Sequence, residues 1–169
     1  MDGNILRCGN YGKVSGCGKY TEKRTYRIYQ GGIVGTSTRV NINDCYSTGN
    51  LGLVGDKTYN YIGGISGDAS LCTISNCYFS TEITPVVDKK SGIVASSSSN
   101  TIDNCYYLKS SYQGIGTNSD SGTVVSKTSS QLKNITNTLN NISNVWVNDS
   151  SPNINDGYPI LRWEVENVE

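Results

Sequence analysis

The side chains of this chain that could do chemistry are carboxylates and thiols, because its 169 residues include no histidine. A serine or cysteine nucleophile would have no imidazole base, which excludes the common hydrolase triads. Five aspartates are candidates for a paired-carboxylate glycosidase site or for the calcium ion of a lyase: Asp44, Asp56, Asp68, Asp88 and Asp103. No two of them are adjacent, and Asp44 and Asp103 stand at different distances from the next cysteine. We therefore expect no catalytic residues, and acids that lie in solvated loops or corners.

Thiols are the second reactive group. Four of the six cysteines recur at one position of a sequence repeat: Cys8, Cys45, Cys77 and Cys105. Stacked strands would hold their sulfur atoms about 4.8 Å apart, too far for an unstrained disulfide, so we expect free, buried thiols. A disulfide that involves Cys17 or Cys72, which fall outside the repeat, is the alternative. No C-x-x-C pair occurs, and we expect no metal and no cofactor.

Two groups of residues are candidates for ligand binding. The stretch 19–27 is basic and aromatic, and its Lys23, Arg24 and Arg27 could hold an acidic glycan or a nucleic acid, unless the stretch is only a solvated loop. A tyrosine also follows three of the repeated cysteines: Tyr46, Tyr78 and Tyr106. We expect these rings on the outside of the fold, either as a column that stiffens a sheet or as a flat face for sugars or proteins.

A repeat of the form Ile, two polar residues, Cys, Tyr positions these groups. Its clear copies begin at Ile42, Ile74 and Ile102 and contain Cys45, Cys77 and Cys105. A glycine-rich signature precedes each copy, and the isoleucines of the signature each lie 12 residues before the cysteine: Ile33, Ile65 and Ile93. A segment of constant length joined by connections of variable length is typical of a solenoid. We expect these isoleucines and cysteines to form columns in its interior.

The spacing within the repeat also predicts a bend. Residues three apart in a straight strand face opposite sides, yet the Ile and the Cys should both point inward. The residues between them tolerate the left-handed conformation: Asn43-Asp44, Ser75-Asn76 and Asp103-Asn104. The sequence therefore predicts an all-β fold, a right-handed parallel β-helix or β-solenoid of about four rungs over residues 1–125.

Residues 126–169 have a different pattern, which predicts a C-terminal cap of a short helix and strands. Thr128 and Gln131 match a capping box, and apolar residues at helical spacing predict an amphipathic helix over residues 126–141: Leu132, Ile135, Leu139 and Ile142. Extended segments are expected over 145–147 and 158–163. We expect Trp146 and Trp163 in the core of the cap rather than as a platform for sugar rings.

Charge and hydropathy argue against two kinds of partner. The chain has 14 basic and 14 acidic residues and no net charge, which disfavours binding to nucleic acid or to an anionic membrane surface. No apolar run is long enough to span a membrane, and the first residues do not resemble an export signal. Because the chain opens directly on repeat-like sequence, we expect a monomeric piece of a longer protein with flanking domains.

The residues also resemble a known family. The signature GGIVG at 31–35, the spacing from Ile33 to Cys45 and the segment NDCYSTGN at 43–50 resemble the GLUG-motif repeat of bacterial surface and adhesin-like proteins. The tail from Val145 to Trp163 is similar to the segment that closes such arrays. The resemblance implies a β-helix that presents or spaces other domains, at the cell surface or outside the cell.

We therefore expect a non-enzymatic structural or adhesion module, a stalk or ligand-presenting solenoid, with a host glycan or protein as its partner. A glycan-binding module is one alternative. A carbohydrate-active β-helix enzyme is another, and it would need clustered acids on one face of the solenoid.

Overall fold

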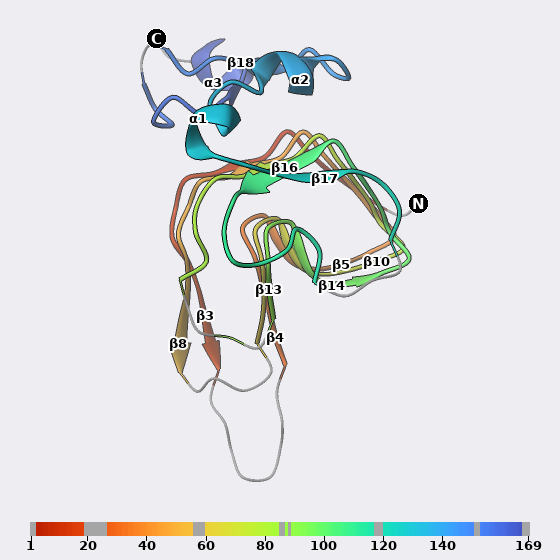
Figure 1. The fold of residues 1–169 in the computed structure, drawn as a ribbon. Helices are drawn as coiled ribbons and strands as arrows, with labels where there is room; N and C mark the ends of the chain where they lie inside the picture. Colours follow the sequence, from red (N-terminus) through yellow and green to blue (C-terminus); the bar gives the residue numbers. More distant parts are fainter. Residues whose placement is uncertain are drawn as a thin grey trace, which may run out of the picture.

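In the computed structural model, the described residues are mostly β, with 47% strand and 9% helix. The structure describes residues 3–18, 27–55, 60–84, 87, 89–116, 120–150 and 153–166. Figure 1 shows a body of stacked strands, with the C-terminal helices on one side of it and paired strands projecting from the opposite side.

Three parallel sheets build the body, and each takes one strand from successive parts of the chain. The first has the order β1 (Gly3–Leu6), β6 (Val40–Asn43), β11 (Thr73–Ser75), β15 (Thr101–Asp103). The second has the order β2 (Gly9–Asn10), β7 (Tyr46–Ser47), β12 (Tyr78–Phe79), β16 (Cys105–Leu108), β17 (Val124–Lys127). The third has the order β5 (Val34–Thr38), β10 (Ser66–Ser70), β14 (Val94–Ser98).

Two further parallel sheets form the projecting part, which we call the arms (Figure 1). One arm pairs β3 (Val14–Gly18) with β8 (Leu51–Gly55). The other has the order β4 (Ile28–Gly31), β9 (Asn60–Gly63), β13 (Lys89–Ser91).

The strand register aligns equivalent residues of the repeat in columns. Ile42 pairs with Ile74, and Ile74 pairs with Ile102; all three side chains are fully buried. The three repeated cysteines that follow them, Cys45, Cys77 and Cys105, are fully buried in the same core. In the glycine-rich signature, backbone bonds link Ile33 to Ile65 and Ile65 to Ile93, and of these only Ile33, in the first copy, is partly exposed. Burial of these apolar side chains is the main stabilising contribution to the stack.

The predicted bend lies between the first and second sheets. Asp44, Asn76 and Asn104 adopt φ angles of 53°, 57° and 50°, in the left-handed region that asparagine and aspartate tolerate best. A second left-handed bend, between the third sheet and the first, is made by residues that gave no such signal: Arg39, Leu71 and Ser99, each at φ 56°.

The glycine-rich signature is explained by close approach of the chain to itself. A Cβ atom added to Gly64 would lie 2.1 Å from the carbonyl oxygen of Gly92 and 2.4 Å from the Phe79 ring. No other residue fits between adjacent strands at this point.

The tail differs in detail from the prediction. The helix expected over 126–141 is wrong as a single element: β17 runs to Lys127, and two short helices follow, α1 (Ser129–Leu132) and α2 (Thr136–Asn140). The capping box of Thr128 and Gln131 is confirmed. Strands β18 (Trp146–Val147) and β19 (Ile160–Leu161) pair antiparallel, and an unpredicted helix, α3 (Trp163–Glu166), ends the described chain. Ile142 and Trp163 are exposed, so their predicted place in the core is wrong.

Candidate functional site

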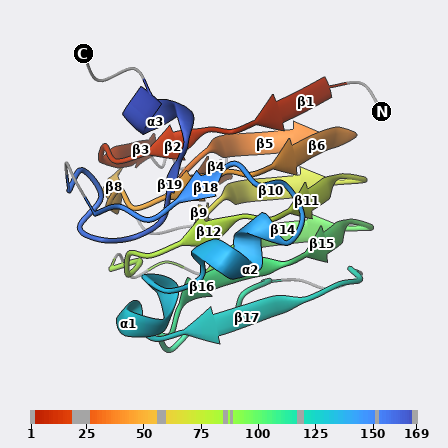
Figure 2. The ribbon, with the colours of Figure 1, turned by 90° about the horizontal axis from the view of Figure 1, so that it is seen from above.

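The tyrosines predicted as an exterior face are buried. Tyr46 and Tyr78 are fully buried, and Tyr106 is 7% exposed. The rings of Tyr46 and Tyr78 stack with centroids 5.2 Å apart and an interplanar angle of 6°. Their role as a ligand face is therefore wrong, because the tail of the chain covers them. Figure 2 shows α2 and β18 lying across the sheet that contains β7, β12 and β16.

The cover over this column is an apolar layer from the tail. Trp146 is 1% exposed, and its ring centroid lies 5.8 Å from that of Tyr46 and 5.7 Å from that of Tyr78. Five more buried residues of the tail complete the layer: Leu132, Ile135, Leu139, Tyr158 and Leu161. We call residues 128–166, as far as they are described, the cap.

Asp44, one of the candidate acids, holds the cap to the repeat. Its carboxylate accepts hydrogen bonds from Trp146 Nε1 at 3.1 Å, from Ser143 Oγ at 2.6 Å and from Asn76 Nδ2. Asn43 Nδ2 donates to its second oxygen at 3.0 Å. Four protein donors thus surround this buried carboxylate, which gives Asp44 a structural role.

A second carboxylate, Glu164 of α3, joins the end of the cap to the first strands. It accepts hydrogen bonds from Tyr11 Oη at 2.5 Å and Tyr46 Oη at 2.7 Å, and from the backbone N–H of Leu161 at 2.6 Å. Burial, followed by the hydrogen bonds with Tyr11 and Glu164, raises the pKa of Tyr46 far above its ordinary value. The hydroxyl is thus held as a neutral donor to the carboxylate.

The other candidate acids do not converge. Asp68 is half-buried on β10, and Asp103 is exposed on β15, in two different sheets. Asp56 and Asp88 lie outside the described residues. Across the described part of the chain, no three His, Cys, Asp or Glu side chains are grouped so that they could hold a metal ion.

The described cysteines are free thiols. Four of them stand at the repeated position, and Cys72 is the fifth. The alternative of a disulfide at Cys72 is therefore wrong, and the side chain of Cys17 lies outside the described residues. Burial raises the pKa of the Cys77 thiol, which keeps it protonated and unreactive.

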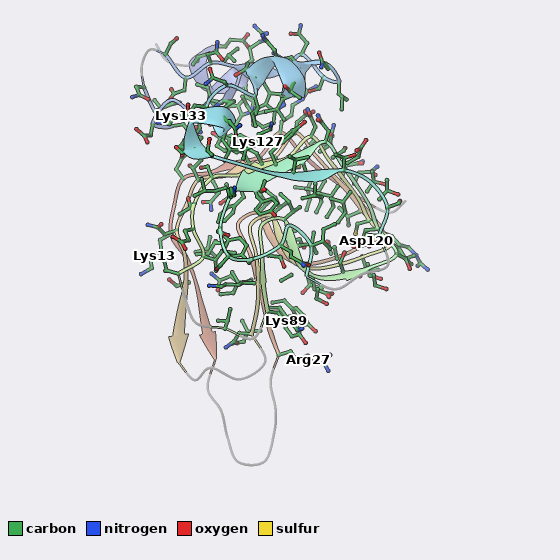
Figure 3. The ribbon with its side chains drawn as sticks, in the orientation of Figure 1. Lys13, Arg27, Lys89, Asp120, Lys127 and Lys133 are labelled. Carbon is green, nitrogen blue, oxygen red and sulfur yellow. The ribbon has the colours of Figure 1, made fainter. Side chains whose placement is uncertain are left out.

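Of the basic candidates, the structure describes Arg27, which lies at an arm. Lys23 and Arg24 lie outside the described residues, and Arg27 is exposed immediately before β4. Figure 3 shows Arg27 and Lys89 on the arm, well away from the cap residue Lys133.

A second tyrosine column, not predicted from the sequence, lies beside them. Tyr29 and Tyr61 pair in register on β4 and β9, with ring centroids 5.0 Å apart, and both are partly exposed. Lys89 continues the column on β13. These three residues each stand four positions before an isoleucine of the glycine-rich signature, a spacing that could have revealed the column.

A groove of about 400 Å³ runs along the seam between the repeat and the cap. Its floor carries hydroxyl side chains from the ends of β7 and β12, namely Thr48, Ser80 and Thr81. Its walls are Tyr11 and the cap loop: Ile154, Asn155, Asp156 and Tyr158. Tyr11 and Ile154 are 43% and 41% exposed, so the groove combines polar groups on the floor with apolar groups on the rim.

Comparison with known proteins gives no relative from which a site could be assigned. No family model, no curated protein and no solved structure matches the chain. No helix within the described residues is long and apolar enough to cross a membrane.

Proposed function

We propose that residues 1–125 form a right-handed parallel β-solenoid of about four rungs, that residues 126–169 close its side as a cap, and that the whole is a non-enzymatic structural and adhesion module. We place it at the surface of a bacterial cell or in a secreted protein, between flanking domains. Its partner would be a host glycan or protein.

The observation that carries this proposal is the contrast between constant columns and variable connections. The Ile and Cys columns keep their register from one repeat to the next. The connections that leave them differ: β7 is followed by β8 in one repeat, whereas the described residues between β12 and β13 in the next contain no strand. A scaffold whose interior is invariant and whose outward segments vary suits presentation of a binding surface.

The similarity to GLUG-motif repeats supports the same reading, because the motif residues lie where a stacked repeat needs them. Gly64 stands where no Cβ atom fits, and Asp44 stands at a left-handed corner.

A second candidate function is saccharide binding at the arm. The Tyr29–Tyr61 column is partly exposed, and aromatic side chains pack well against the apolar faces of sugar rings. Lys89 at its end would add a contact for an acidic sugar.

Bead adhesion under flow tests the adhesion role. The full chain, biotinylated at its C-terminus, is coupled to streptavidin beads, and bead retention on immobilised mucin and on epithelial monolayers is compared with that of albumin-coated beads. We expect retention well above the albumin control. Retention equal to the control on both surfaces would contradict the proposal.

A further inference from the structure

We propose that the groove between the repeat and the cap is a binding site for a neutral saccharide. This inference deepens the adhesion role and rests on it. The site is distinct from the buried tyrosine column and from the arm, since it is lined by the ends of β7 and β12 and by the cap loop 154–158.

Two hydroxyl groups of the groove have no hydrogen-bond partner within the described chain. Ser80 is only 6% exposed. Within the described chain its hydroxyl makes no hydrogen bond, whereas its backbone N–H donates to the carbonyl oxygen of Ser47. The hydroxyl of Thr48 likewise has no described partner, although its carbonyl oxygen accepts from Thr81. Ser80 is buried and Thr48 is half-buried, and both line the groove, so these two hydroxyls are open to a hydrogen bond with a bound molecule.

Asn155 adds a fixed acceptor. Its amide nitrogen donates to Tyr78 Oη at 2.8 Å and to the carbonyl oxygens of Tyr158 and Pro159, which fixes the orientation of the side chain. Its carboxamide oxygen accepts no hydrogen bond from a described residue, and the side chain is 96% buried, its exposed fraction being 4%. The oxygen is therefore held in place at the wall of the groove before any ligand arrives.

Hydroxyl groups and one fixed acceptor match the chemistry of a saccharide. A sugar hydroxyl both donates and accepts, as the hydroxyls of Thr48 and Ser80 do, whereas Asn155 offers an acceptor alone. The exposed ring of Tyr11 and the side chain of Ile154 supply apolar surface for the C–H face of a pyranose ring. A volume of about 400 Å³ lies within the range of small-ligand sites.

The charges at the groove favour a neutral sugar over an acidic one. The only ionisable carboxylate among the lining residues is Asp156, which is largely exposed and pairs with Lys133 Nζ at 3.3 Å. Lys133 in turn lies over the Tyr158 ring, 5.0 Å from its centroid. No Lys or Arg is among the described residues that line the groove, and the nearby Lys133 is already paired with Asp156, so the groove offers less to an anionic ligand than to a neutral one.

The test is binding of the full chain to an array of neutral, sialylated and sulfated glycans, followed by calorimetric titration of the strongest neutral ligand. Ser80→Ala and Thr48→Val remove the hydroxyls alone. We expect each to weaken binding about fivefold, the loss of one hydrogen bond, with unfolding midpoints unchanged because neither hydroxyl has a partner in the protein. Ser98→Ala and Thr38→Val, which remove exposed hydroxyls in the third sheet, are the matched controls and should leave binding unchanged.

Three results would overturn the inference: no neutral glycan bound at millimolar concentration, binding unaffected by Ser80→Ala and Thr48→Val, or binding abolished by Tyr61→Ala in the arm instead. The adhesion role is judged separately by the bead assay. If beads carrying the Ser80→Ala variant are retained as well as beads carrying the parent protein, the groove is not the binding site, but the adhesion role stands. If beads carrying the parent protein are not retained at all, both proposals fail.

Discussion

Two columns of tyrosine in the described structure have the same in-register strand pairing but differ in burial. Tyr46 and Tyr78 pair in register on β7 and β12, and Tyr29 and Tyr61 pair in register on β4 and β9. The first column is fully buried and the second is partly exposed. The difference lies outside both columns: the tail folds over one of them and leaves the other uncovered.

The buried column has hydrogen-bond partners that the exposed column does not need. Tyr78 Oη donates to the carbonyl oxygen of Pro159 at 2.5 Å and accepts from Asn155 Nδ2, and Tyr46 Oη donates to Glu164. A hydroxyl removed from water costs free energy unless such partners replace the water. The cap therefore supplies both the apolar cover and the polar groups that make this column part of a core.

The largest effect is expected from removing the centre of the cover. Trp146→Ala should lower the free energy of unfolding by about 3–5 kcal/mol, because it leaves a large cavity against Tyr46 and Tyr78. Urea denaturation measures the loss. Trp163→Ala is the comparison, since Trp163 is 47% exposed, and it should lower the stability by clearly less than Trp146→Ala does. Equal effects of the two substitutions would mean that the cap does not pack on the column.

The hydrogen bonds of Asp44 under the cap should contribute somewhat less to the free energy of unfolding than Trp146 does. Asp44→Ala should destabilise the protein by about 2–3 kcal/mol, because Trp146 Nε1 then remains buried without an acceptor and Asn76 Nδ2 keeps only Ser143 Oγ. Thermal unfolding checks this, with Asp103→Ala as the control at an exposed acid. A loss at Asp44 no greater than that at Asp103 would show that the junction does not form.

High pH should weaken the buried column. Burial raises the pKa of Tyr46 and of Tyr78 above the ordinary value of 10.0, so both stay protonated in the folded protein while they ionise in the unfolded chain. Their contribution is fully present below about pH 10 and is lost as the pH rises further, by about 1.4 kcal/mol per pH unit for each tyrosine.

Denaturation midpoints from pH 8 to 11 measure this loss. The pKa of Cys77 is also raised by burial and adds a loss that begins near its ordinary value of 9.0. Tyr78→Phe removes one of the two tyrosine contributions, so it should make the decline above pH 10 less steep and leave the contributions of Tyr46 and the thiol. An unchanged slope in Tyr78→Phe would contradict the burial of this hydroxyl.

The smallest effect is expected at the exposed column. Tyr61→Ala should cost at most about 1 kcal/mol, since it removes one cross-strand aromatic contact at a partly solvated site. Chemical denaturation beside Tyr78→Ala gives the comparison directly. If Tyr61→Ala were as damaging as Tyr78→Ala, the two columns would not differ in burial.

The parts of the fold that could be predicted are those fixed by local spacing. The 12 residues from Ile33 to Cys45 and the asparagine or aspartate at the bend follow from what stacked strands require. The second bend could not be predicted in this way, because Arg39, Leu71 and Ser99 are residue types that carry no preference for a left-handed corner.

The candidate site was harder to predict because its parts come from distant segments. The burial of Tyr46 depends on Trp146, which lies one hundred residues later in the sequence. No local pattern around the tyrosines indicates that Trp146 covers them. The groove depends on Thr48 and Ser80, ordinary hydroxyl residues whose lack of a partner is visible only once the cap loop is in place. The exposed column, by contrast, has a local signal, because Tyr29 and Tyr61 each lie four residues before Ile33 and Ile65.

The central claim is that equivalent isoleucines of successive repeats lie directly over one another inside the fold. Nuclear Overhauser spectroscopy on protein labelled at the isoleucine δ1 methyl groups tests it, because adjacent strands are only about 4.8 Å apart. The account predicts cross-peaks from Ile74 to Ile42 and from Ile74 to Ile102, and none directly between Ile42 and Ile102. A spectrum in which the Ile74 methyl group shows neither cross-peak would contradict the stacked repeat and the functions proposed on it.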